Sequence, residues 1–203
     1  SIGHFAGRME YGPRALGNRS ILADPRNREM QKNLNLAIKK RESFRPFAPS
    51  CLEEDVEKFF AIKEGKKSPY MLLTQPISDS IKTELTQEEK NYKGIEKLKA
   101  YRSILPAITH VNYSARIQTV SKEVNPRYWN IINEFKKLTD CSVVVNTSFN
   151  IRGEPIVNTP ENAYKCFMFT DLDVLVLENF VLLKEEQNKI DGIEQYQKQF
   201  TLD

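Results

Sequence analysis

Apolar residues recur at helical spacing in several parts of the chain. The pattern predicts helices over 24–40, 125–138 and 159–169, and a shorter one over 53–60. Each of the three longer segments opens with a polar residue followed by proline, a pair suited to the N-cap and the first helical position. The apolar face of the second helix would comprise Trp129, Ile132, Phe135 and Leu138.

Short runs of apolar or β-branched residues predict strands between these helices. The predicted strands are 2–6, 47–52, 69–74, 104–111, 115–120, 142–145, 173–177 and 180–183. Segment 142–145 is rich in valine and bounded by polar residues, which is typical of a fully buried central strand. Strands that alternate with helices in this way predict an α/β domain built around a mixed sheet.

Two segments lack a clear apolar pattern. Residues 78–100 consist largely of Lys and Glu with few large apolar side chains, so we expect a solvated, partly helical excursion. Residues 185–203 form a polar tail that we expect to be helical or frayed. The predicted domain therefore spans 1–184 and includes the excursion.

Composition narrows the class of protein. The chain has 203 residues, of which 40% are hydrophobic and 28% charged, as in globular proteins. No apolar run approaches the roughly 18 residues of a membrane span, and the polar start does not match a signal peptide. Three widely spaced cysteines suggest neither a disulfide framework nor a thiolate zinc site. We therefore expect a cytoplasmic protein without membrane contact.

Positive charge is concentrated at the start of the chain. The net charge is +3, but residues 1–50 hold ten Lys or Arg against four Asp or Glu. This distribution favours an anionic ligand or partner, with ordinary surface charge as the alternative.

Segment 7–20 intersperses glycines with Arg8, Arg14 and Arg19. Glycines let backbone amides approach a ligand closely, and guanidinium groups can bind phosphate or carboxylate through two parallel hydrogen bonds. The spacing fits neither a Walker loop nor a GxGxxG fingerprint. An anion site and a structural turn with salt-bridged arginines both remain open.

A second basic segment covers 39–50. Lys39 lies at the expected end of the first helix, where the favoured interpretation is that it complements the helix dipole. Arg45 lies between Phe44 and Pro46, where the backbone is held extended and where we expect these neighbours to be buried. We therefore expect the guanidinium of Arg45 to have a dedicated partner.

On the predicted strand 115–120, Arg116 and Gln118 project from the same face. These side chains could bind an anion and its polar neighbour, or they could simply face solvent. His110 could act as a general base or metal ligand, but a lone histidine on an apolar segment is more often structural. The same holds for His4.

Segment 145–155 leaves the carboxyl end of the predicted buried strand, where open α/β sheets bind ligands. It offers amides, hydroxyls and one guanidinium at Asn146, Thr147, Ser148, Asn150 and Arg152. These groups could form a site, or they could satisfy the backbone of the turn itself. No GxSxG motif is present, so a serine nucleophile is not predicted.

Seven motifs follow one another along the chain. They are GRMEYGPRALGNRSILADPR (7–26), FRPFAPS (44–50), PAITHV (106–111), ARIQTV (115–120), NPRYW (125–129), NTSFNIRGEPIV (146–157) and TDLDVLVLENF (170–180). In this order they resemble the C-terminal domain of the carbamoyltransferase family, which includes nodulation and antibiotic-tailoring O-carbamoyltransferases. The resemblance covers roughly residues 2–184. His4 and Tyr11 depart from it, so no role is carried over to His4.

The resemblance implies one half of a two-domain enzyme. The C-terminal domain is similar to the YrdC fold, a twisted mixed sheet with flanking helices and a basic concave face. It is expected to form carbamoyl-adenylate from carbamoyl phosphate and ATP. The partner is an N-terminal domain similar to ASKHA-fold enzymes of tRNA threonylcarbamoylation, which carries the metal-dependent transfer to an acceptor hydroxyl. The 203 residues leave no room for that domain, so we expect a transferase fragment that performs a partial reaction.

The resemblance also implies site residues. The family's carbamoyl phosphate and nucleotide pocket falls on Arg14, Lys40, Arg45, Arg116, Asn146, Ser148 and Asn150. Its three arginines are the expected catalytic residues, because they offset the repulsion between two polyanionic substrates. Lys39, adjacent to Lys40, is the alternative for the lysine. The expected cofactors are ATP and its bound Mg²⁺, and no metal site on the chain itself is predicted.

An RNA-binding module is a competing interpretation. The basic first fifty residues, Trp129 and eight tyrosines could serve RNA, and the YrdC fold occurs in tRNA-modifying enzymes. The small net charge and the lack of a long basic stripe weigh against nucleic acid. A docking domain without catalysis of its own is the third possibility.

Overall fold

The chain forms two compact units in a computed structural model that describes residues 1–63, 65–188 and 192–200. The first unit comprises Ser1–Ala23, Lys32–Ser43 and Asn146–Asp203, and the second comprises Asp24–Gln31 and Phe44–Val145. Strand β6 (Val143–Ser148) begins in the second unit and ends in the first. The predicted domain boundary at residue 184 stays a prediction.

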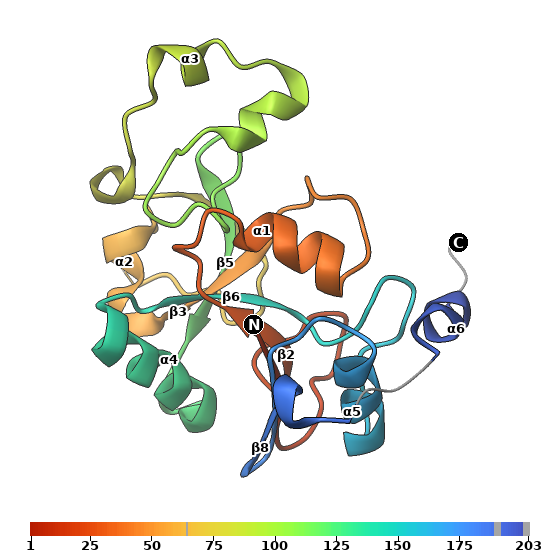
Figure 1. Ribbon diagram of the computed structural model, residues 1–203. Helices are drawn as coiled ribbons and strands as arrows, with labels where there is room; N and C mark the ends of the chain where they lie inside the picture. The colour runs from red at the N-terminus through yellow and green to blue at the C-terminus, as the bar shows by residue number, and fades with distance from the viewer. Residues whose placement is uncertain (64, 189–191, 201–203) are drawn as a thin grey trace. The chain divides into compact units, whose positions relative to one another are not determined.

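The sheet of the first unit has the strand order β6-β2-β1-β7-β8 (Figure 1). Strand β1 (Ile2–Phe5) pairs antiparallel with β2 (Arg19–Ala23) and parallel with β7 (Val174–Leu177), which pairs antiparallel with β8 (Phe180–Leu183). Helix α5 (Pro160–Met168) contacts β1 and β7, and the side chain of its N-cap Thr159 accepts a hydrogen bond from the Asn162 amide. The predicted strands 2–6, 173–177 and 180–183 and the predicted helix 159–169 are therefore confirmed, whereas β2 was not predicted.

The second unit has the strand order β4-β5-β3-β6. Strand β5 (Ser114–Val120) pairs antiparallel with β4 (Leu73–Pro76) and parallel with β3 (Ala48–Leu52). Helix α4 (Pro126–Thr139) contacts β3, and its N-cap Asn125 accepts a hydrogen bond from the Tyr128 amide at 3.1 Å. The sequence-based prediction of an α/β fold with a mixed sheet and flanking helices is confirmed.

The other elements are short. They are α1 (Met30–Asn33), a π-helical turn (Leu34–Ile38), α2 (Val56–Phe59), α3 (Gln87–Lys90), α6 (Ile193–Lys198) and 3-10 turns at Glu53–Asp55, Asp79–Ile81, Gly94–Lys99 and Lys184–Glu186. The excursion 78–100 is partly helical, as predicted, and buried Ile81 and Ala100 hold its two ends. Of the predicted tail, 189–191 and 201–203 lie outside the described residues.

The predicted strand 104–111 is wrong. The segment is a series of turns in which the Thr109 hydroxyl donates to the Leu105 carbonyl and the Ser103 hydroxyl accepts from the Leu105 amide. Pro106 has no N–H for a sheet ladder. Leu105 and Ile108 of this segment are buried in the core, whereas Ile104 is exposed.

Three further boundaries differ from the predictions. The helix predicted from residue 24 begins at Met30, because the Asp24 carboxylate accepts from the Arg26 amide and guanidinium and so closes a turn instead. The strand predicted at 69–74 starts at Leu73. On α4, Tyr128 and Ile132 form the buried face, whereas Leu138 is 85% exposed.

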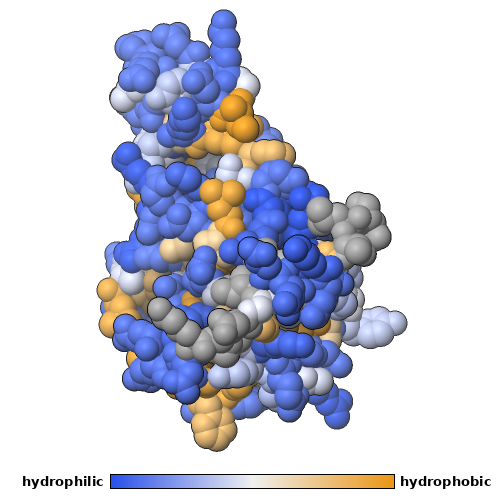
Figure 2. Space-filling view, turned by 45° about the vertical axis from the view of Figure 1, so that its right-hand side comes forward, coloured by the Kyte–Doolittle hydropathy of each residue, from blue (hydrophilic) through white to orange (hydrophobic). Residues whose placement is uncertain are grey.

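No helix among residues 1–63, 65–188 and 192–200 combines the length and hydropathy needed to span a membrane. The face drawn in Figure 2 is mostly hydrophilic, with small separate hydrophobic areas. Single exposed apolar side chains of this kind are ordinary for protein surfaces.

Gly3 supports a test of the packing in the first unit. A Cβ atom at Gly3 of β1 would lie 2.5 Å from Cζ of Phe149, whose ring is fully buried. We expect Gly3→Ala to destabilise the chain by about 1–3 kcal/mol in urea denaturation, because a filled core cannot accept the methyl group. In a Phe149→Leu background the added cost should fall. An equal cost in both backgrounds would show that the ring is not the obstacle.

Candidate functional site

A buried lysine lies at the carboxyl end of β6, within the first unit. The ammonium group of Lys39 donates to the Ser148 carbonyl and hydroxyl oxygens at 2.5 and 3.1 Å, and to the Asn150 carbonyl and Oδ1 at 2.9 and 2.6 Å. The Ser148 hydroxyl also donates to Asn150 Oδ1 at 2.7 Å. We call Lys39, Ser148 and Asn150 the lysine cluster. It joins segments that are more than a hundred residues apart.

The backbone before Lys39 explains how its side chain reaches the interior. Residues 34–38 form a π-helical turn, closed by the bond from the Lys39 amide to the Leu34 carbonyl at 2.8 Å. A π-turn takes more residues per turn than an α-helix and is frequent at functional sites. The wider turn therefore brings Lys39 onto the buried side of the segment, together with Leu34 and Ile38.

The next residue points elsewhere. Lys40 has a φ of +51°, and its ammonium lies 3.8 Å from a carboxylate oxygen of Asp171. The lysine that meets Ser148 and Asn150 is therefore Lys39, and its interpretation as a helix-dipole partner is wrong. The predicted regular helix did not indicate that Lys39 would lie beside Ser148 and Asn150. The one signal in the sequence was that Lys39 is adjacent to Lys40. The role assigned to Lys40 stays a prediction.

Two effects compete at the Lys39 ammonium. Burial, strengthened by nearby Arg41, lowers the pKa of Lys39 to about 7, because both disfavour the charged form. The surrounding carbonyl, hydroxyl and amide oxygens favour the ammonium as hydrogen-bond acceptors. The group is thus a cation that can lose its proton near neutral pH.

The loop that carries Arg14 is held by two charged side chains. The Glu10 carboxylate accepts from the Leu16 and Asn18 amides, both at 2.7 Å. The buried Arg19 guanidinium donates to the carbonyls of Ala6, Gly7 and Asn18 and lies 3.5 Å above the Phe5 ring. Arg19 therefore has a structural role in segment 7–20. An anion-binding role stays a prediction for Arg14.

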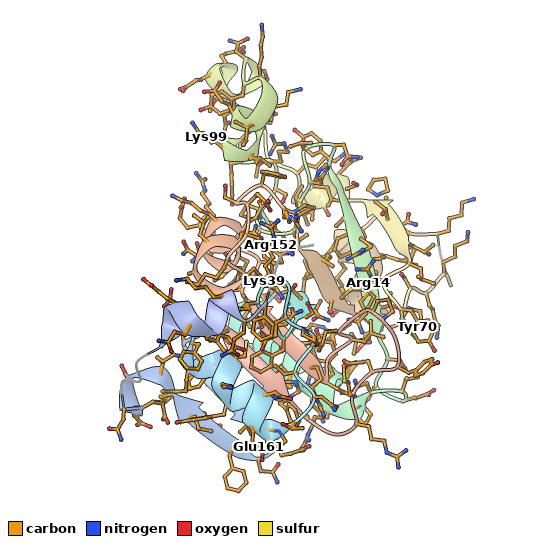
Figure 3. All side chains as sticks on the ribbon, turned by 90° about the vertical axis from the view of Figure 1, so that its right-hand side faces the viewer. Arg14, Lys39, Tyr70, Lys99, Arg152 and Glu161 are labelled. Atoms are coloured by element: carbon orange, nitrogen blue, oxygen red, sulfur yellow. The ribbon has the colours of Figure 1, made fainter. Side chains whose placement is uncertain are left out.

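Asn146 connects this loop to β6. Its amide nitrogen donates to the carbonyl of Ala15 at 3.1 Å, in the buried interior next to Arg14. Arg14 itself is exposed and makes no hydrogen bond or ion pair within the described part of the chain, so it is available to a ligand (Figure 3). His4 is buried and pairs through Nδ1 with the Gly17 carbonyl at 2.6 Å, which fits its structural interpretation.

The remaining predicted residues belong to the second unit. Arg45 is exposed just before β3, and Arg116 is half-buried on β5. Ser50 pairs with Gln118, and its hydroxyl donates to Gln118 Oε1 at 2.6 Å. Arg116 lies two residues before Gln118 on β5. Phe44 and Pro46, on either side of Arg45, are exposed, so the prediction that they are buried is wrong. Gln118 is buried, so the solvent-facing interpretation is wrong for that residue.

A second layer lies behind the lysine cluster. The Asn150 amide donates to the Glu154 carbonyl at 2.6 Å, and the Ile151 amide donates to Glu154 Oε2 at 2.8 Å. Arg152 donates from its backbone amide to the Lys39 carbonyl at 3.1 Å, and Figure 3 shows the two residues close together. Glu154 was not among the predicted site residues, although it lies within the quoted motif 146–157. Lys39 was only the alternative to Lys40.

The chemistry of these groups suits an anion rather than a resident metal. No group of three or more His, Cys, Asp or Glu side chains that could hold a metal ion occurs in the described ranges. In the first unit, Lys39, the Ser148 hydroxyl and the Asn150 amide donate to oxygens of the fold itself. Arg14 is an exposed guanidinium, a group that binds oxyanions. His110 is paired with Asn112 at 3.1 Å. The convergence of all seven predicted residues on one pocket stays a prediction.

Comparison with known proteins gives a consistent result. The family model described as the carbamoyltransferase C-terminus matches residues 1–184. The chain is 57% identical over 202 residues to an uncharacterised protein of Synechocystis, covering all of this chain and 32% of that protein. It is 46% identical over 184 residues to the nodulation protein NolO of Bradyrhizobium diazoefficiens, covering 90% of this chain and 30% of that protein.

A third relative has an enzymatic name. The chain is 38% identical over 152 residues to the 3'-hydroxymethylcephem-O-carbamoyltransferase of Amycolatopsis lactamdurans, covering 75% of this chain and 24% of that enzyme. The chain thus spans between a quarter and a third of the length of these relatives.

Lys39 gives the site a pH signature. Between pH 7 and the ordinary lysine value of 10.5, the unfolded chain holds a proton on Lys39 that the folded chain releases. The free energy of unfolding should therefore rise with pH across this window, by about 1.4 kcal/mol for each unit of pKa difference. Urea denaturation at several pH values checks this, with Lys39→Met expected to remove the rise. The same slope in both proteins would contradict the low pKa of Lys39.

Proposed function

Because the chain belongs to the family of the carbamoyltransferase C-terminus, we propose that it binds carbamoyl phosphate and ATP and forms carbamoyl-adenylate. A longer protein would then use this intermediate to carbamoylate an acceptor hydroxyl. The observation that carries the proposal is the lysine cluster, with its buried cation beside a hydroxyl and an amide at the end of β6. These groups match what recognition of a carbamoyl group and a phosphate requires.

The proposed reaction balances in two steps. Water first cleaves carbamoyl phosphate to carbamate and inorganic phosphate. A carbamate oxygen then attacks the α-phosphorus of ATP, the bond to the β-phosphate oxygen breaks, and pyrophosphate leaves. The attacking carbamate is already an anion, so this step needs no general base, which suits a chain with two histidines. No covalent protein intermediate is proposed.

The protein's task in this reaction is to hold negative charges together. Carbamoyl phosphate and the triphosphate repel each other, and cationic side chains fixed in advance lower that cost in the transition state. Lys39 and Arg14 supply this charge within the first unit. Arg45 and Arg116 stay predicted ligands and are tested by substitution. Mg²⁺ enters as part of the nucleotide substrate and neutralises phosphate charge.

The acceptor step belongs to a further domain in this proposal. In this proposal the chain is the C-terminal part of a transferase, which the family description and the roughly threefold greater length of its relatives support. We propose an N-terminal ASKHA-like domain as the partner that transfers the carbamoyl group from the adenylate. The name of the Amycolatopsis relative specifies an O-carbamoyltransferase, which supports a hydroxyl acceptor.

The first test is pyrophosphate release from ATP with and without carbamoyl phosphate. We expect release to depend on carbamoyl phosphate, and Arg14→Ala and Arg116→Ala to lower kcat/KM at least ~30-fold, or about 2 kcal/mol, through loss of a phosphate-binding guanidinium. Arg127→Ala, on the exposed side of α4, is the matched control and should retain activity. Undiminished release in both site variants would place the reaction elsewhere.

A salt titration separates the small-molecule site from an RNA-binding module. Between ~50 and ~300 mM salt, affinity for an RNA bound through many phosphates should fall by several orders of magnitude. We expect instead that the KM for carbamoyl phosphate changes only a few-fold, because few charges are neutralised. Steep salt dependence of tight binding to a single-stranded RNA, with no turnover of ATP, would favour the alternative.

A further inference from the structure

A buried tyrosine of the C-terminal helix contacts the layer behind the lysine cluster. Tyr196 lies on α6 (Ile193–Lys198) and is 3% exposed. Its ring stacks on Phe169 with a centroid distance of 4.6 Å, and Phe200 packs edge-on against it at 5.3 Å. Its hydroxyl donates to Glu154 Oε1. All of these residues belong to the first unit.

Glu154 connects that hydroxyl to the candidate site. While Oε1 accepts from Tyr196, Oε2 accepts from the Ile151 amide at 2.8 Å, and the Glu154 carbonyl accepts from the Asn150 amide group at 2.6 Å. The Asn150 carbonyl, which shares a peptide unit with the Ile151 amide, accepts from Lys39 at 2.9 Å. Hydrogen bonds and this one peptide unit thus lead from Tyr196 through the Glu154 carboxylate to the Lys39 ammonium.

The surroundings of the phenol keep this contact in place. Burial, reinforced by the Glu154 carboxylate and the nearby Cys166 thiol, raises the pKa of Tyr196, so the phenol stays a donor at neutral pH. The pKa of the Cys166 thiol is raised as well, mainly by burial. Glu154 is half-buried, and removal of one of its donors leaves one carboxylate oxygen without that hydrogen bond, which weakens the hold on its position.

Tyr196 lies outside the part of the chain that the family model matches. The family match ends at residue 184, and the match to NolO covers 184 residues, whereas the match to the Synechocystis protein covers 202. A contact from beyond residue 184 is therefore an addition to the common domain.

We propose that Tyr196 is a positioning residue that fixes the loop after β6 in its binding arrangement through Glu154. This inference rests on the proposed function for its consequence in catalysis. Tyr196 acts through Glu154 and Asn150 and does not touch the substrate. Without the Tyr196 hydroxyl, a smaller fraction of molecules has the loop in the binding arrangement. The apparent affinity for carbamoyl phosphate falls in proportion to that fraction, whereas the turnover of the bound complex is unchanged.

The experiment compares the wild-type chain with Tyr196→Phe, which keeps the stacked ring and removes the hydroxyl. One readout is amide hydrogen exchange at Ile151, measured by NMR without ligand. The second is the KM for carbamoyl phosphate and the kcat of pyrophosphate release. We expect ~10-fold faster exchange and a ~10-fold higher KM, with kcat within about twofold of wild type. Tyr164→Phe, at an exposed tyrosine on α5, is the matched control and should leave both readouts unchanged.

The outcomes distinguish the two proposals. Unchanged exchange at Ile151 in Tyr196→Phe overturns the positioning role. Faster exchange with an unchanged KM overturns it as well, because Tyr196 would then stabilise the fold without affecting binding. If the wild-type chain releases no pyrophosphate, the proposed function fails, and the exchange readout alone decides whether Tyr196 fixes the loop. Glu154→Gln should reproduce the faster exchange, because both variants break the same series of hydrogen bonds.

Discussion

The first unit depends on one buried cation. The Lys39 ammonium donates to both Ser148 and Asn150 at the end of β6, and so it fixes the segment after the π-turn to both residues. Removing a lysine from water is costly, and a fold retains such a group when its oxygen partners and its use offset the cost. The candidate site is therefore centred on a buried lysine whose desolvation is costly.

Segment 7–20 is also fixed by buried polar groups, here a carboxylate, a guanidinium and an amide. Glu10 and Arg19 satisfy the backbone of segment 7–20 from the inside, and Asn146 ties it to β6. That leaves Arg14 exposed on a loop whose conformation is already fixed. Preorganised charge of this kind favours binding and catalysis, because little order has to be created when the anions arrive.

Much of the fold followed from local patterns in the sequence. The valine-rich β6, the N-caps of α4 and α5, and the pairing strands β7 and β8 carry strong signals, because apolar period and capping chemistry agree there. The lysine cluster was only half predictable. Ser148 and Asn150 were predicted from the loop expected after a buried strand, although β6 extends to Ser148. The choice of Lys39 over Lys40 depends on a π-turn and a positive φ, which no local pattern encodes. Tyr196 reaches Glu154 through tertiary packing, which the sequence does not show.

The account's central claim is that the lysine cluster is an anion-binding site. NMR titration of the chain with carbamoyl phosphate tests it most directly, with the signals of Lys39 Nζ and of the Ser148 and Asn150 amides followed at each concentration. The account predicts saturable shifts of these signals at one common dissociation constant, with the exposed face of α4 unaffected. Saturable shifts elsewhere with an unperturbed lysine cluster would contradict it.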